Sequence, residues 1–275
     1  MIPVGSPQLV RERFDAVKSV APSFETNLYA GRDILESWTR TGLLFHEEVG
    51  RTTFFFKKDA DFFHLFYVSP SRDDLGRGLE AVAGRPEILT ADVVAKTAAK
   101  APVLDAFRAN GFYAHNILVR MCRTGRPGGE EDGAPGEVQT AAEADVARIH
   151  DVLDRNFDRY AEQIPSADEI AEDIGRQRFL LVDKGGAVAG LVHYEITGLT
   201  SHLRRWFVNP DFRGQQVGSR LLRRYFSLSG QATRFILWVL RSNENAIGRY
   251  LHYGYHIDDL ADTIFINKEK MRYGS

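Results

Sequence analysis

The chain has 275 residues, enough for two domains of ordinary size or one large one. A hydrophobic fraction of 44% and a charged fraction of 26% are typical of a soluble globular protein, and no apolar run is long enough for a membrane span. The 35 basic and 37 acidic residues are interspersed and the net charge is −2, so bulk electrostatics favour small molecules or proteins over nucleic acid as partners.

The N-terminal residues, 1–6, show no basic stretch followed by an apolar core, which predicts a cytoplasmic protein rather than a secreted one. Cys122 is the only cysteine, which excludes an internal disulfide framework and a thiolate-rich zinc site. His193 and His202 have no histidine or carboxylate companions at metal-ligand spacing. We therefore expect no metal site.

The clearest break in the chain is residues 124–137, a run of glycine, proline and charge without apolar periodicity. Such a composition is typical of an exposed linker. It predicts two domains, residues 1–123 and residues 138–275, each near the commonest domain size.

Both halves carry the same order of signals. The strand-like runs 62–68 and 203–208 each end on Val-x-Pro, and at a similar distance behind each comes a glycine followed by an aromatic residue. The shared order predicts a duplicated fold. A chance coincidence of the two short pairs is the alternative.

Two capping boxes open the second half. Thr140–Glu143 predicts the start of a helix whose apolar positions, ending at Phe157, fall on one face. Ser166–Glu169 predicts a second helix, which contains Ile170 and Ile174.

The remaining pattern predicts a sheet with two crossover helices. A hairpin at 179–196, with paired glycines in its turn, is followed by a strand ending at Val208. The later elements are expected at 217–229 (helix), 235–240 (strand), 244–253 (helix) and 263–266 (strand). The order is ααβββαβαβ, an α/β architecture with a mixed sheet.

The turn between the strand ending at Val208 and the helix from Val217 is the main candidate binding site. Backbone N–H groups in such a turn can point together, and the helix N-terminus adds partial positive charge, so the loop suits a pyrophosphate. The alternative is a helix start where glycines merely ease the turn. The spacing fits neither a Walker A loop nor a dinucleotide fingerprint.

Two segments resemble the GNAT (Gcn5-related N-acetyltransferase) family. Residues 208–222 resemble its acyl-CoA-binding segment, with Arg213 and Gly218 matching the family's pattern and Gln216 at the position of its first glycine. Residues 243–255 resemble the family's Asn-x-x-Ala-x-x-x-Tyr-x-x-x-Gly-Phe segment. The resemblance implies two GNAT-like domains in tandem, each a mixed central sheet flanked by helices.

The resemblance also implies which residues bind the cofactor, acetyl-CoA or another acyl-CoA. The pantetheine arm would lie along the strand at Phe207 and Val208 and beside Asn243 and Ala246 at a helix start. The pyrophosphate would bind the loop formed by Arg213, Gly214, Gln215, Gln216, Val217, Gly218 and Ser219. Asn243 is alternatively a routine helix N-cap.

Tyr250 matches the family's tyrosine near the thioester sulfur, and we expect it to be the general acid that protonates the leaving thiolate. Its alternative role is aromatic packing. Glu195 is the candidate general base, with a solvated surface carboxylate as the alternative. The segment 157–166 would shape the acceptor site, where Asp158, Tyr160 and Glu162 would suit a cationic or polar acceptor; an ordinary loop between helices is the other interpretation.

The first half lacks the binding loop. Asp73 and Asp74 stand where a phosphate would approach, and Phe107 stands where Tyr250 stands in the second half. We expect residues 1–123 to be a degenerate GNAT-like domain that does not bind CoA. A docking surface for a carrier protein or an independent fold is the alternative.

The expected function is N-acyl transfer, most simply acetyl transfer, from acyl-CoA to a primary amine of a small molecule or peptide. The amine would attack directly in a ternary complex, without a metal. We expect a monomer or homodimer. A non-catalytic acyl-CoA-binding or regulatory module, or transfer from a carrier-protein-bound donor, is the alternative.

Overall fold

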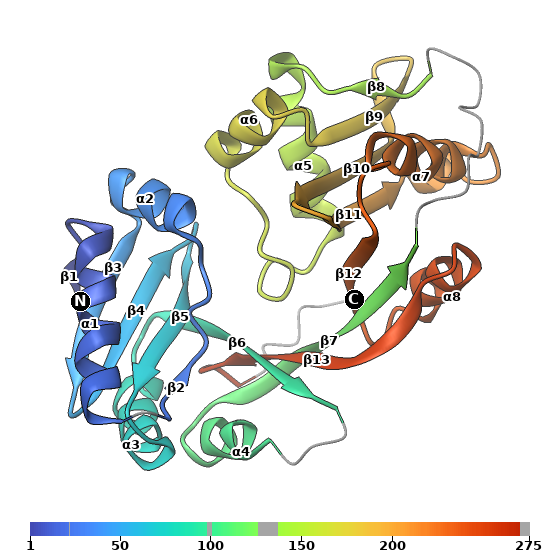
Figure 1. The fold of residues 1–275 in the computed structure, drawn as a ribbon. Helices are drawn as coiled ribbons and strands as arrows, with labels where there is room; N and C mark the ends of the chain where they lie inside the picture. Colours follow the sequence, from blue (N-terminus) through green and yellow to red (C-terminus); the bar gives the residue numbers. More distant parts are fainter. Residues whose placement is uncertain (22, 98–100, 126–136, 270–275) are drawn as a thin grey trace. The chain divides into compact units, whose positions relative to one another are not determined.

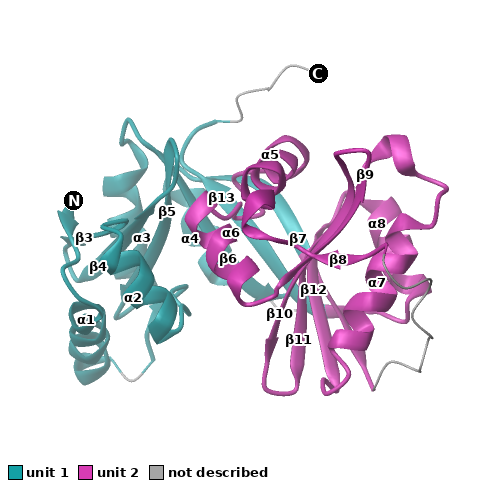
Figure 2. Ribbon diagram, turned by 90° about the horizontal axis from the view of Figure 1, so that it is seen from above, with its two compact units in different colours: residues 1–118, 259–275 teal, residues 119–258 magenta. Residues whose placement is uncertain are grey.

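The computed structural model describes residues 1–21, 23–97, 101–125 and 137–269. They form two compact units (Figure 2): unit 1 contains residues 1–118 together with 259–275, and unit 2 contains residues 119–258. Most of the predicted linker, residues 126–136, lies outside the described residues.

Unit 1 is a mixed sheet between two layers of helices (Figure 1). Its elements are β1 (Ile2–Pro3), α1 (Pro7–Val20), β2 (Glu25–Thr26), α2 (Arg32–Arg40), β3 (Leu44–Val49), β4 (Thr52–Lys58), β5 (Phe62–Ser69), α3 (Arg72–Ala83), β6 (Ile88–Lys96), α4 (Pro102–Ala109) and the first half of β7 (Tyr113–Thr124). The strand order is β1-β3-β4-β5-β6-β13. Only the β5–β6 pair in this order is parallel.

The alternation along β4 shows how this sheet is covered on both faces. Phe54 and Phe56 belong to the core under α3 and α4, while Phe55 between them belongs to the core under α1 and α2. Successive side chains of a strand point to opposite faces, so three consecutive phenylalanines serve two cores. All three are fully buried.

Unit 2 has the same two-sided construction. Its elements are the second half of β7, β8 (Gln139–Thr140), the 3₁₀ turn η1 (Glu143–Asp145), α5 (Val146–Asn156), α6 (Ala167–Gly175), β9 (Phe179–Lys184), β10 (Ala187–Thr197), β11 (Thr200–Val208), the 3₁₀ turn η2 (Pro210–Phe212), α7 (Val217–Leu228), β12 (Arg234–Leu240), α8 (Glu244–His252) and the start of β13 (His256–Ile266). The strand order is β7-β12-β11-β10-β9-β8, with β11 and β12 parallel.

Strand β9 separates the two cores of unit 2. Phe179 and Leu181 belong to the core under α5 and α6, whereas Leu180 and Val182 belong to the core that includes α7. Each unit is therefore an α/β body with a mixed sheet flanked by helices, which confirms the predicted fold class.

The chain exchanges strands between the two units. Strand β7 leaves unit 1 after Leu118 and continues in unit 2, and β13 leaves unit 2 after Asp258. There β13 pairs with β6 of unit 1, from Leu260 opposite Lys96 to Ile266 opposite Thr90. Each compact unit thus contains residues from both halves of the sequence. The domain boundaries at 1–123 and 138–275 stay a prediction.

One of the two predicted capping boxes is confirmed. The Ser166 hydroxyl accepts the N–H of Glu169 at 3.3 Å, and the Glu169 carboxylate accepts the N–H of Ser166 at 2.8 Å. The box at Thr140 is wrong, because Thr140 lies in β8 opposite Leu180. The helix entry instead uses Asp145, whose carboxylate accepts the N–H of Ala142 at 2.9 Å.

Candidate functional site

The site of unit 2 begins where two parallel strands diverge. The ladder between β11 and β12 runs from Thr200 opposite Arg234 to Leu203 opposite Leu237 and ends there within the described residues. Both strands continue, β11 to Val208 and β12 to Leu240. The peptide groups of residues 204–208 that face β12 are thus available to a bound chain-like ligand.

The turn after β11 leads directly into a helix N-terminus. Gly214 and Gln216 both adopt positive φ, at 77° and 60°. The first helical hydrogen bond runs from the N–H of Arg220 to the carbonyl of Gln216 at 3.0 Å. The N–H groups of the first turn of α7 have no acceptor inside the helix, and the helix dipole adds positive charge there, so this end suits an anion.

Packing explains the glycine at Gly218. A Cβ there would lie 2.9 Å from the Trp206 ring and 3.1 Å from Val208 Cγ2. Likewise, a Cβ at Gly190 of β10 would lie 2.8 Å from Val217 Cγ1. The two glycines let α7 lie close on β10 and β11, which brings its N-terminus to the point where β11 and β12 diverge.

Two polar side chains of the loop, those of Gln215 and Ser219, already have partners. Lys184 Nζ donates to Gln215 Oε1 at 2.8 Å and lies 3.5 Å from the Glu137 carboxylate, which also pairs with Arg220. The Ser219 hydroxyl bonds the Tyr253 hydroxyl at 3.0 Å. Lys184 comes from the β9–β10 hairpin, so no local motif could reveal it as a neighbour of the loop.

Asn243 and Ala246, at the start of α8, are bound to each other. Asn243 Oδ1 accepts the N–H of Ala246 at 3.1 Å, so Asn243 is the N-cap of the helix. This is the structural role that its residue type favours. A further role of either residue in cofactor binding stays a prediction.

Tyr250 lies buried at the centre of an aromatic cluster. Its ring is 5.5 Å from that of Trp206 and 5.9 Å from that of Tyr255, and its exposed fraction is 7%. Burial raises the pKa of Tyr250 well above its ordinary value, and the negative charge of Glu162 raises it further. The phenol therefore keeps its proton and can donate it.

Glu195, the base predicted from sequence, lies between two guanidinium groups. It pairs with His202 across β10 and β11, and its carboxylate lies 3.9 Å from Arg178 and 3.8 Å from Arg204. The arginines that bind Glu195 are not among the residues described above as neighbours of Tyr250, which are Trp206 and Tyr255. Glu195 is thus a half-exposed, paired carboxylate, and its role as the general base stays a prediction.

A buried polar chain, which the sequence did not reveal, runs from α6 through the sheet to the loop between α5 and α6. His193 Nε2 lies 3.0 Å from the Asp173 carboxylate, and His193 Nδ1 lies 3.0 Å from Arg205 Nη1. Because Arg205 can only donate, Nδ1 must accept, and the imidazole proton lies on Nε2 facing Asp173.

Arg205 extends this chain to the loop between α5 and α6. Its Nη2 donates to the carbonyls of Glu162 and Gln163, at 2.6 and 2.5 Å. Burial lowers the pKa of Arg205 to about 10 and that of His193 to about 4. At neutral pH the arginine is charged and the histidine is neutral.

The corresponding opening in unit 1 is filled by the chain itself. The β5–β6 ladder runs from Phe62 opposite Ile88 to His64 opposite Thr90, and both strands continue beyond it. Asn27 lies in the gap: its amide nitrogen donates to the carbonyls of Leu65 and Asp92, at 3.0 and 3.1 Å, and its oxygen accepts the Tyr67 N–H at 2.9 Å.

The helix that follows β5 is closed as well. Ser71 caps α3 by accepting the N–H of Asp74 at 3.1 Å, and the Asp74 carboxylate accepts from Arg77 at 2.7 Å. Phe107 is fully buried. In unit 1 an aspartate and a serine thus occupy the helix N-terminus that is free for an anion in unit 2.

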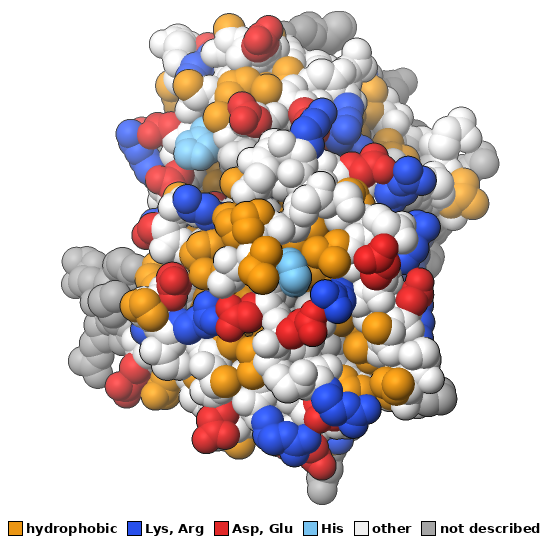
Figure 3. All heavy atoms as spheres, turned by 90° about the vertical axis from the view of Figure 1, so that its left-hand side faces the viewer, with side chains coloured by type: hydrophobic (Ala, Val, Ile, Leu, Met, Phe, Trp, Pro, Cys, Tyr) orange, Lys and Arg blue, Asp and Glu red, His pale blue; other side chains and the backbone are white. Residues whose placement is uncertain are grey.

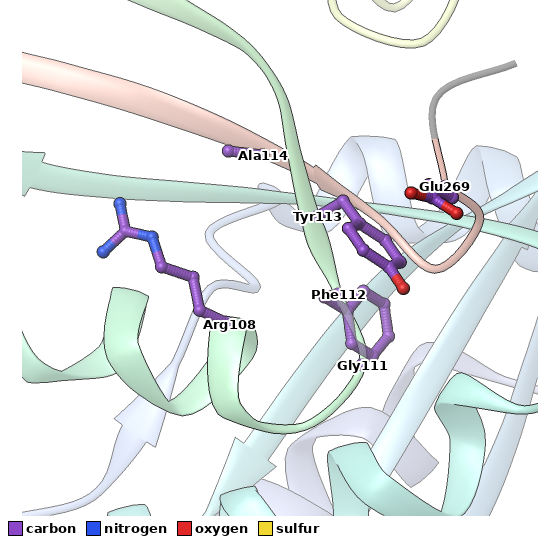
Figure 4. Close-up of a pocket in the computed structure, with 6 residues that line it drawn as sticks. All are labelled: Arg108, Gly111, Phe112, Tyr113, Ala114 and Glu269. Atoms are coloured by element: carbon purple, nitrogen blue, oxygen red, sulfur yellow. The ribbon is translucent and has the colours of Figure 1, made fainter.

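The surface supplies little further indication of a binding site. A pocket in unit 1 (Figure 4) is lined by Arg108, Gly111, Phe112, Tyr113, Ala114 and Glu269, none of which belongs to the loop or strands described above. On the face shown in Figure 3, acidic and basic side chains are interspersed among apolar ones. In the described part of the chain, no helix is long and apolar enough to cross a membrane, and no cluster of three or more His, Cys, Asp or Glu could hold a metal.

Comparison with known proteins gives one family match. Residues 146–255 match the model of the acetyltransferase (GNAT) family. The matched range contains the diverging strands, the loop, α7 and Tyr250. No curated protein matches the chain.

Solved structures share the fold at low identity. A GCN5-related N-acetyltransferase from Sphaerobacter thermophilus is 14% identical, with a TM-score of 0.57 over 94% of this chain and 90% of that one. One from Kribbella flavida is also 14% identical, with a TM-score of 0.57 over 86% and 95%. A tandem GNAT protein from the clavulanic acid biosynthesis pathway is 12% identical, with a TM-score of 0.62, and the match covers 98% of both chains. The last similarity supports a tandem, two-domain arrangement.

Proposed function

Because residues 146–255 form a domain of the acetyltransferase (GNAT) family, we propose that the chain is an N-acyltransferase that moves an acyl group from acyl-CoA to a primary amine. The observation that carries this proposal is the divergence of β11 from β12 after Leu203, beside the free N-terminus of α7. A strand edge for an extended arm and an anion site for a pyrophosphate lie next to each other.

The strand edge and the loop would bind different parts of the cofactor. The open edge of β11, including Phe207 and Val208, would accept the pantetheine amides as an added strand would. The loop from Arg213 to Ser219 would bind the pyrophosphate through backbone N–H groups and the dipole of α7. Free CoA carries that pyrophosphate and a carrier-bound arm does not, which favours acyl-CoA as the donor.

Tyr250 would supply the proton for the leaving group. When an amine attacks the thioester carbonyl, the tetrahedral intermediate collapses by expelling a thiolate. A phenol that stays protonated at every physiological pH can protonate that sulfur. The raised pKa of Tyr250 means that the phenol still carries its proton when the thioester is attacked, which the role requires.

Calorimetry with acetyl-CoA, together with thiol release over a panel of primary amines, tests the proposal. We expect micromolar or tighter binding and turnover with at least one amine. Tight binding with no turnover on any amine would instead support a non-catalytic acyl-CoA-binding module, the alternative to an enzyme.

Tyr250→Phe separates acid catalysis from binding. We expect kcat to fall about 100-fold or more, since a positioned general acid contributes that much, with the Kd for acetyl-CoA unchanged within about twofold. Tyr113→Phe is the matched control, because Tyr113 is 47% exposed and lies in unit 1. A Tyr250→Phe enzyme with the full rate across the pH range would remove the assignment.

A further inference from the structure

Three charged side chains meet beside the loop that precedes α7. Glu137, two residues before β8, pairs with Arg220 of α7 and lies 3.5 Å from the Nζ of Lys184. Lys184 Nζ also donates to the side-chain oxygen of Gln215, in the loop itself, at 2.8 Å. The three charged side chains are 27–30% exposed. One edge of the loop thus carries two cations around a single carboxylate, and we call these three residues the ion cluster.

The backbone that carries Lys184 is fixed, whereas its side chain can turn. Lys184 is the last residue of β9, and the turn after it is closed by the Asp183 carboxylate, which accepts the N–H of Gly186 at 2.9 Å. Arg148 of α5 pairs with Asp183 and donates to the Gly186 carbonyl at 3.0 Å. A lysine carries its charge on a flexible four-carbon stem. The ammonium group can therefore exchange one partner for another while the hairpin stays in place.

Lys184 is also the only lysine between residues 119 and 258, where the other long basic side chains are all arginines. Arginine suits planar, two-pronged hydrogen bonding, whereas lysine binds phosphate as a compact point charge. The one lysine of unit 2 thus lies against the loop that suits an anion.

The ion cluster leaves positive charge in excess at this loop, because one carboxylate faces two cations. Arg213 adds a further charge: it is exposed and forms no ion pair with a residue that the structure describes. Lysine and arginine bind phosphate with the same charge-assisted hydrogen bonds that they make to a carboxylate. Glu137 and a phosphate at the loop would therefore compete for the same cations.

We propose that Glu137 is an internal counter-anion of the cofactor loop, and that acyl-CoA displaces it by drawing Lys184 from Glu137 and Gln215 to one of its phosphates. This rests on the proposed binding of acyl-CoA. The ligand group is a phosphate, supplied either by the diphosphate of CoA or by its 3′-phosphate. Partly exposed ion pairs contribute little to stability, so the cofactor can break this one at small cost. Lys184 becomes a further cofactor-binding residue, and Glu137 lowers the affinity by competing for it.

Glu137→Gln tests the competition, measured as the Kd for CoA by calorimetry. We expect the affinity to rise about three- to tenfold at low ionic strength, because the competing carboxylate is gone, and the gain to shrink in high salt. Damage to the fold would weaken binding, so a gain cannot come from misfolding. Asp211→Asn removes the same charge from an exposed residue of the same turn and should change the Kd by less than about twofold, since screened charges act weakly. Equal gains in both variants would mean general repulsion and would overturn the counter-anion.

Lys184→Ala tests the new contact and identifies the phosphate. We expect CoA to bind about tenfold more weakly, while Lys184→Arg retains most of the affinity. An equal loss with dephospho-CoA, which lacks the 3′-phosphate, assigns the contact to the diphosphate, and a loss with CoA alone assigns it to the 3′-phosphate. Lys96→Ala, at an exposed lysine of unit 1, is the matched control and should bind both ligands as the parent does. Unchanged affinity of Lys184→Ala for both ligands would reject the contact.

Two further measurements show whether Glu137 acts through Lys184. In the Lys184→Ala background, Glu137→Gln should gain at most half of its factor in affinity, because one of the two competing cations is absent. After reductive methylation with ¹³C-formaldehyde, which keeps the charge, the NMR signal of Lys184 is the one missing from Lys184→Arg, and it should shift on saturation with CoA. A full gain in the double variant, or a Lys184 signal that stays in place, would contradict the exchange of partners.

These binding measurements keep the counter-anion distinct from acyl transfer. The expected changes in Kd without turnover on any amine would retain the counter-anion and reject acyl transfer. Turnover by a protein whose CoA affinity is the same in the parent, Glu137→Gln and Lys184→Ala forms would retain acyl transfer and reject the counter-anion. An absence of CoA binding in both the parent and Glu137→Gln would reject both.

Discussion

Gln216 adopts a left-handed backbone conformation that is unfavourable for any residue other than glycine. The left-handed region costs a non-glycine residue about 1–2 kcal/mol, yet Gln216 adopts it with φ of 60° at the start of α7. The resemblance placed a family glycine at this position, and the structure supplies the physical reason for that glycine. The loop keeps the conformation, because Gly218 and Val217 fix α7 against the sheet on one side.

Replacing Gln216 with glycine should therefore relieve strain. The substitution removes the cost of the left-handed conformation, but glycine also has more conformational freedom in the unfolded chain, which offsets part of the gain. We therefore expect a net stabilisation of about 0.5–1 kcal/mol. Urea unfolding measures it, with acetyl-CoA affinity retained. Gly214→Ala, at φ of 77°, is the reciprocal control and should destabilise by a similar amount.

His193 predicts a pH dependence of stability. Its pKa is lowered to about 4 by burial in the fold, compared with an ordinary value of 6.5, so the unfolded chain binds more protons between these limits. The contribution of His193 is complete above pH 6.5 and is lost as the pH falls toward 4, at about 1.4 kcal/mol per pH unit.

Urea unfolding of the parent and His193→Gln proteins between pH 4.5 and 7.5 measures this term. We expect the variant to be less stable at neutral pH, since the contacts with Arg205 and Asp173 change, but to show a shallower decline with acid. Parallel pH profiles of the two proteins would mean that another group controls the decline.

At the scale of elements, the same divergence of parallel strands has two outcomes. Between β11 and β12 the opening is lined by the open edge of β11, whereas between β5 and β6 it is bridged by Asn27. Segment β2 additionally pairs with β5. The chain thus supplies in unit 1 the hydrogen bonds that a bound arm would supply in unit 2.

This difference predicts one cofactor per chain. Calorimetry with CoA should give a stoichiometry near one, and Arg213→Ala should weaken that single event. Asn27→Ala should lower the stability of unit 1 by about 1–3 kcal/mol, because buried backbone groups lose their partners, without changing the CoA affinity. A second binding event that survives Arg213→Ala would contradict the assignment of unit 1 as non-binding.

The sequence predicted those features that are local. The capping box at Ser166, the hairpin turn at Gly185 and Gly186 and the loop before Val217 each follow from a few adjacent residues, and all three occur. The buried polar chain from Asp173 to the loop between α5 and α6 could not be predicted, since its members come from α6, β10 and β11 and follow no sequence spacing. The same holds for Asn27, because nothing in the sequence around it indicates that its side chain bridges β5 and β6.

At the scale of the molecule, β13 brings a late part of the sequence, residues 259–266, into unit 1. Phe265 is fully buried there, with its ring 4.9 Å from that of Phe107. We expect Phe265→Ala to destabilise unit 1 by about 3–5 kcal/mol. Hydrogen exchange should show the loss in β5 and β6, while Ile257→Ala, at a 51% exposed position of the same strand, should leave it unchanged. Equal protection in both variants would show that unit 1 does not depend on this strand.

The exchange of β7 and β13 makes this polypeptide a natural candidate for fragment complementation. A cut between residues 125 and 137 would give two pieces, the first lacking the strand that pairs with β6 and the second lacking the neighbour of β12. Each piece alone would expose an apolar strand edge and tend to aggregate. When the two pieces are co-expressed, each supplies the strand that the other lacks, and recovery of acyl-transfer activity would show that they have associated.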